Sequence, residues 1–92
     1  MITAKEAREI SIKNKESIVF KESKDLKANI TSAITQSMGE GKTGVELTAK
    51  LRQSDTVTKI ICDYFGDLGY KITIDFNGYN EGISEVFIGV TW

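Results

Sequence analysis

A Gly-Lys-Thr step at Gly41–Thr43 is the part of the chain that most resembles a catalytic motif, because phosphate-binding loops end in such a step. The full motif needs a glycine five positions before the glycine of the Gly-Lys pair, a strand before the loop and a helix after it. Gln36 occupies that position here, and the expected elements are a helix before the step and a strand after it. We therefore predict that residues 39–44 end a helix and link it to a strand.

Nucleophilic and zinc chemistry have little support in the composition. The chain has no histidine and one cysteine, which excludes a histidine-based triad, a Cys/His zinc site and an internal disulfide. A reactive thiolate needs a nearby base or cation, whereas Cys62 is followed by Asp63. We expect Cys62 to be a small, partly buried residue, in a reducing compartment.

Two groups of acidic residues could bind a metal ion. Asp63 and Asp67 are four residues apart on an expected helix, but no further ligand converges on them. The segment from Asp75 superficially resembles a calcium loop, yet position six is Asn80 instead of glycine and position twelve is Val86 instead of glutamate. We predict no metal site, no cofactor and no catalytic residue, and hence a protein that is not an enzyme.

The charge is nearly balanced but unevenly distributed along the 92 residues. Twelve basic and 13 acidic residues give a net charge of −1. Residues 1–59 hold 11 basic and 8 acidic residues, and residues 60–92 hold Lys71 against five acidic residues. The last third would repel phosphate, so nucleic acid is not the expected partner. The alternating charges near the N-terminus are typical of a solvated helix face.

Helices are predicted in the first 38 residues, which contain neither glycine nor proline. Thr3 and Glu6 form a capping box for a helix to about Asn14. A second helix runs to about Met38, with its start left open between Ser17 and Ser23. Whether residues 15–23 continue one helix is open at this point.

Period-two alternation after residue 44 predicts three strands, over residues 45–51, 70–76 and 86–92, with a helix from Ser54 or Asp55 to Gly69 between the first two. The predicted fold is a single α+β domain over residues 1–92, in which three helices pack on one face of a three-stranded sheet in the order α-α-β-α-β-β. The last two strands form a hairpin, and the strand order is left open. The predicted core is Ile34, Leu47, Ile61, Ile72 and Ile88.

Membrane and secretion signals are absent from the sequence pattern. No apolar run approaches 18 residues, and no charged and then apolar leader follows Met1. We expect a cytoplasmic protein with no membrane contact.

The C-terminal hairpin is the predicted interaction surface. Phe87 breaks the alternation, because it lies on the polar side of its strand. We predict that its outer face binds a partner with a basic surface, through Asp75, Tyr79, Glu81, Glu85 and Phe87. Of these, Tyr79 and Glu81 are expected at the exposed tip, because residues 77–82 are rich in turn-forming asparagine and glycine. The uncharged third strand, which ends on Trp92, is expected to pair or pack in a homo-oligomer through Phe87, Val90 and Trp92.

Four short segments carry a resemblance: the opening residues 1–9, the Gly41–Thr43 step, the Leu68-Gly69-Tyr70 step and the terminal residues 89–92. Together they resemble small uncharacterised accessory proteins of tailed bacteriophages. The resemblance implies a non-enzymatic protein that blocks or sequesters a host component, such as a defence factor, in the host cytoplasm. One alternative is a small virion or assembly component. A third hypothesis is nucleic-acid binding through the basic N-terminal helices.

Overall fold

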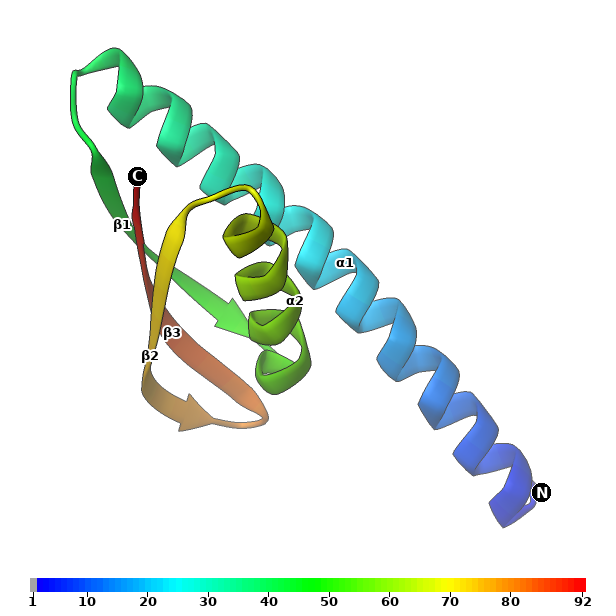
Figure 1. Ribbon diagram of the computed structural model, residues 1–92. Helices are drawn as coiled ribbons and strands as arrows, with labels where there is room; N and C mark the ends of the chain where they lie inside the picture. Colours follow the sequence, from blue (N-terminus) through cyan, green and yellow to red (C-terminus); the bar gives the residue numbers. More distant parts are fainter. Residues whose placement is uncertain (1) are drawn as a thin grey trace.

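The computed structural model describes residues 2–92, which form two helices packed on one face of a three-stranded antiparallel sheet (Figure 1). The elements in chain order are α1 (Ala4–Gly39), β1 (Gly44–Leu51), α2 (Ser54–Asp67), β2 (Lys71–Asn80) and β3 (Ile83–Thr91). The predicted α+β class and the C-terminal hairpin are confirmed. The predicted number of three helices is wrong, because the two N-terminal helices are one.

Helix α1 is continuous over 36 residues. It begins after Thr3, whose Oγ1 accepts a hydrogen bond of 3.2 Å from the amide of Glu6, as the capping box predicts. The expected break after Asn14 does not occur, because residues 15–23 contain no glycine or proline that would end a helix. At about 1.5 Å per residue, α1 is much longer than the sheet that it covers.

Only the second half of α1 packs on the rest of the protein. Leu26, Ile30 and Ile34 are buried against the sheet and α2, whereas every residue from Ile2 to Ser17 is exposed. Figure 1 shows this first half extending past the sheet into solvent. We call residues 4–17 the arm.

Helix α2 ends where the sequence predicts, at a glycine followed by an aromatic residue. Gly69 has a φ of 94°, which a residue with a side chain rarely adopts. The amide of Tyr70 donates to the carbonyl of Phe65 at 3.1 Å, and the two rings lie 6.0 Å apart. This closing motif, with its apolar contact, turns the chain directly into β2.

Strand β3 is the centre of the sheet, whose order is β1-β3-β2. Both neighbours run antiparallel to β3, with Ile88 opposite Leu47 on one side and opposite Ile74 on the other. Strands β1 and β2 therefore run in the same direction and are connected through α2, with β3 inserted between them. The prediction that the third strand offers a free edge for pairing is wrong, because both of its edges are paired.

The core lies between the sheet and the helices. Ile34, Ile61 and Ile88 are buried as predicted. Leu47 and Ile72 are only partly buried, because they belong to the two edge strands. The buried hydrophobic residues are Leu26, Ile30, Ile34, Leu51, Val57, Ile61, Phe65, Val86, Ile88 and Val90.

A carboxylate on α1 holds the start of α2. The two oxygens of Glu22 accept hydrogen bonds from the backbone amides of Arg52, at 2.8 Å, and Gln53, at 3.0 Å. Gln53 is the N-cap residue of α2, and its own side chain makes no capping hydrogen bond. Glu22 therefore connects α1 to the turn between β1 and α2, and its charge lies at the positive end of the α2 dipole.

Candidate functional site

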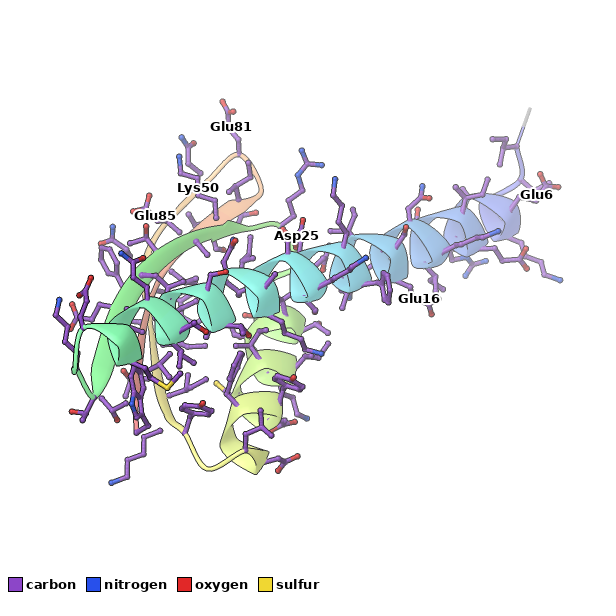
Figure 2. All side chains as sticks on the ribbon, turned by 90° about the horizontal axis from the view of Figure 1, so that it is seen from above. Glu6, Glu16, Asp25, Lys50, Glu81 and Glu85 are labelled. Atoms are coloured by element: carbon purple, nitrogen blue, oxygen red, sulfur yellow. The ribbon has the colours of Figure 1, made fainter. Side chains whose placement is uncertain are left out.

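One face of the sheet has no helix over it among the residues that the structure describes, and we call it the open face. Because side chains alternate along each strand, the apolar set faces the helices and the mostly polar set faces the open side. In Figure 2, Lys50 and Glu85 point to the side of the sheet opposite α2, and Glu81 marks the tip of the hairpin. The open face is formed by Glu46, Thr48, Lys50, Lys71, Thr73, Asp75, Glu85, Phe87, Gly89 and Thr91.

Phe87 lies in the middle of the open face. Its neighbours across the sheet are Thr48 on β1 and Asp75 on β2. The side chain is 44% exposed, although it belongs to the central strand. Neither helix covers it, so a large apolar ring meets solvent between two polar neighbours.

A shallow hollow of about 440 Å³ lies next to the Phe87 ring. Its floor includes Gly89, where an added Cβ would approach the Oγ1 of Thr73 to 2.8 Å, so a side chain at this position would displace Thr73 and fill the hollow. The charged residues that line it are Glu46 and Asp75, both acidic. The hollow therefore combines an aromatic wall with two carboxylates and no cation.

Three of the five predicted partner-binding residues share the open face: Asp75, Glu85 and Phe87. Glu85 is less available than expected, because it lies opposite Lys50 and accepts a hydrogen bond of 3.2 Å from Nδ2 of Asn77. The negative charge of the face is therefore concentrated beside Phe87, at the hollow.

The predicted position of Tyr79 in the turn is wrong. Tyr79 belongs to β2 and lies opposite Ser84, which is buried on the helix side of the sheet. A bulge between Phe76 and Gly78 shifts the register by one residue and sends Tyr79 to the side opposite Phe87. Glu81 does lie at the exposed turn, with a φ of 53°.

The predicted self-association residues are also separated by the sheet. Val90 is fully buried under the helices, whereas Phe87 lies on the open face. Trp92 is partly exposed, and its ring lies 6.1 Å from that of Tyr70. These three residues do not form one surface, so self-association through them has no common contact area.

Only Asp75 and Phe87 of the residues that line the hollow belong to the predicted site, and Glu46 and Gly89 are among those that it lacks. The alternation of β1 does place Glu46 on the polar side of its strand. Its position opposite Gly89 depends on the pairing of β1 with β3. That pairing is long-range, and no local pattern in either strand indicates it.

The Gly-Lys-Thr step is the end of α1, as predicted. The amide of Lys42 donates to the carbonyl of Ser37 at 2.9 Å, which closes the helix. The Nζ of Lys42 lies 3.0 Å from Oε2 of Glu40, and this hydrogen bond and charge lower the pKa of the Glu40 carboxyl. The lysine is thus paired within its own turn, between a helix and a strand.

Cys62 is partly buried on α2, and we expect its thiol to react slowly. Desolvation raises its pKa, and the neighbouring charge of Asp63 raises it further. Because the thiolate is the reactive form, a smaller thiolate fraction at pH 8 predicts slower modification by 5,5′-dithiobis(2-nitrobenzoic acid) than of free cysteine. The rate after unfolding in urea, which should approach that of free cysteine, is the control. A folded-state rate equal to or above that of free cysteine would contradict the assignment.

Within residues 2–92, no cluster of three or more histidine, cysteine, aspartate or glutamate side chains has an arrangement that could hold a metal ion. Over the same residues, neither helix combines the length and the apolar character needed to cross a bilayer.

Comparison with known proteins found no match to the chain among family models, curated proteins or solved structures.

Proposed function

We propose that this protein is a non-enzymatic binding protein whose open face docks on a basic surface of a partner protein. The observation that carries the proposal is the hollow beside Phe87, where an exposed aromatic ring and two carboxylates meet on a face that neither helix covers. Aromatic residues at the centre of a contact, with charges around them, are typical of protein interfaces.

The chemistry of the hollow suits an arginine or lysine side chain. A cation over the face of an aromatic ring is attracted by its quadrupole, by about 0.5–2 kcal/mol depending on desolvation. Asp75 lies opposite Phe87 on β2, and Glu46 lies opposite Gly89 on β1, so a cation in the hollow has a carboxylate on each side of β3. The net charge of −4 over residues 60–92 would steer a basic partner toward this part of the protein.

The resemblance to phage accessory proteins extends the proposal to a host protein with a basic surface, which this protein would block or sequester. The mechanism is steric: a compact domain covers the basic surface and prevents its normal contacts. No bond is made or broken, and the affinity depends on the fit around Phe87.

A peptide of four arginines is the simplest probe of this proposal. Its affinity, measured by isothermal titration calorimetry, should fall about three- to tenfold in Phe87→Ala, which removes the ring. Glu46→Lys should weaken binding at least as much, because it places a cation in the hollow. A peptide of four glutamates should not bind.

The matched control is Glu9→Lys, which makes the same charge change on the arm, far from the open face. If Glu9→Lys weakened binding as much as Glu46→Lys, the peptide would be responding to net charge alone. Equal affinities of the unaltered protein and Phe87→Ala, with both shown to be folded, would refute a site at the hollow.

A further inference from the structure

The outer edge of β2 is unpaired, since β2 is at the end of the sheet and its one strand neighbour among residues 2–92 is β3. Such an edge presents a row of backbone donors and acceptors to any strand of matching register. Proline, bulges and charged side chains usually block a long edge of this kind. Between Tyr70 and Phe76 there is no proline or bulge, and the two charged residues, Lys71 and Asp75, have opposite signs. The segment Tyr70–Phe76 is therefore open to pairing.

The side chains of this segment are self-complementary in the antiparallel direction. With Thr73 placed opposite Thr73 of a second copy, Lys71 faces Asp75 of that copy, and Asp75 faces its Lys71. On the helix side, Ile72 then faces Ile74. Each end pairs Tyr70 with Phe76. Charged residues therefore face opposite charges, apolar residues face apolar residues, and Thr73 faces Thr73 at the centre.

We propose that a second copy of this chain docks on β2, antiparallel and around a two-fold axis at Thr73, so that two sheets join into one of six strands. The same patch then serves both copies, as a two-fold interface requires. This proposal shares Asp75 with the hollow on the open face, but it is argued from the edge of the sheet and its test needs no partner.

The exposure of the edge residues fits this occupant. Phe76 is 58% exposed, and Ile72 and Ile74 are only half-buried. In the proposed pairing, Phe76 gains the ring of Tyr70 from the second copy, and the four isoleucines form a continuous apolar row. Apolar residues that a lone sheet leaves partly in solvent are thereby removed from water.

The surface of α2 above this edge combines small residues with the exposed charged side chains of Asp55 and Lys59. Tyr64 is on the side of α2 that faces α1, since Lys27 of α1 lies over its ring at 4.5 Å. Cys62 and Gly66 are on the other side of the buried stripe of Ile61 and Phe65, toward the β2 edge. Small side chains there leave room for α2 of the second copy when the two sheets join.

Strand β1 forms the other edge of the sheet and is the competing site. Its polar residues also match about Thr48, with Glu46 facing Lys50, but its apolar side would pair Leu51, which is already buried. Helix α1 packs along β1 but not along β2. The gain in buried apolar area is therefore larger at β2.

Charge reversal tests the pairing directly, by sedimentation equilibrium of the full chain without any partner. The unaltered protein should have twice its monomer mass of 10.2 kDa at micromolar concentrations. Lys71→Asp and Asp75→Lys should each weaken the dimer about tenfold or more, because like charges then meet at two positions. The double variant, Lys71→Asp with Asp75→Lys, should dimerise again.

Mixing the two single variants gives the sharpest outcome. In a mixed dimer every charged pair is again of opposite sign, so Lys71→Asp and Asp75→Lys together should form a heterodimer at concentrations at which each variant alone is mostly monomeric. A general loss of folding cannot produce this result. Circular dichroism of each variant establishes that it is folded before mixing.

A matched pair of variants distinguishes the two edges. Thr73→Lys places two lysines opposite each other at the proposed two-fold axis and should give a monomer. Thr48→Lys adds the same charge to the open face on β1 and should leave the dimer intact. A chain that is monomeric at all concentrations up to the millimolar range overturns the proposal. So does a dimer that survives Thr73→Lys and both charge reversals, or one that Thr48→Lys alone abolishes. None of these outcomes depends on the arginine peptide, so failure here is separate from failure of the proposed function.

Discussion

Replacing Ile61 by alanine is expected to lower the free energy of unfolding by about 2–5 kcal/mol. Ile61 has no exposed surface and belongs to the core cluster between the sheet and the two helices. Its truncation removes apolar burial and leaves a cavity that its neighbours on three elements cannot all fill. Small domains have about 5–15 kcal/mol of stability in total, so the variant should be close to unfolding at 37 °C. Urea denaturation followed by circular dichroism measures the change.

The same truncation at two less buried isoleucines is the comparison for this prediction. Ile72→Ala removes the same atoms from a half-buried position on an edge strand and should cost clearly less than Ile61→Ala. Ile12→Ala removes them from the arm, where the side chain is 59% exposed, and should change stability by less than about 0.5 kcal/mol. Equal costs at Ile61 and Ile12 would mean that α2 does not cover the sheet as described.

Replacing Glu22 by alanine is expected to lower the free energy of unfolding by about 1–3 kcal/mol. The substitution leaves the amides of Arg52 and Gln53 without their acceptor and removes a negative charge from the start of α2. The local effect should be larger than the global one, because the turn between β1 and α2 loses its contact with α1. Hydrogen exchange of the two amides should therefore become faster.

Glu16→Ala is the matched control for Glu22, since it removes the same carboxylate from the exposed arm of the same helix (Figure 2). It should change stability by less than about 0.5 kcal/mol and leave exchange at Arg52 and Gln53 unaltered. If Glu22→Ala were as mild as Glu16→Ala in both measurements, the carboxylate would not be holding the turn.

Local patterns predicted the elements of this fold where the chain itself carries the signal. The glycines at 41 and 69 end the two helices as expected, because each accepts a positive φ that other residues avoid. Alternation located all three strands to within a few residues. The continuity of α1 was left open because every residue of the arm is exposed, and so the sequence of the arm carries no stripe of buried apolar residues that would indicate a helix.

The arrangement of the candidate site depends on contacts that are distant in sequence. Alternation alone was enough to place Asp75, Glu85 and Phe87 on one face. Tyr79 was expected in the turn because Asn77 and Gly78 are typical turn residues, but β2 continues through them with a bulge after Phe76 that reverses the side to which every later residue of β2 points. The central position of β3, which brings Glu46 opposite Gly89, depends on the long-range pairing of β1 with β3, and no local pattern in either strand indicates it.

The most direct test of the open face as a binding surface is a map of amide chemical shifts during titration of the ¹⁵N-labelled protein with the four-arginine peptide. The account predicts that the largest shifts occur around Glu46, Asp75, Phe87 and Gly89, on three adjacent strands, and that the arm shifts little. Largest shifts on the arm, or shifts spread evenly over all acidic residues, would contradict it.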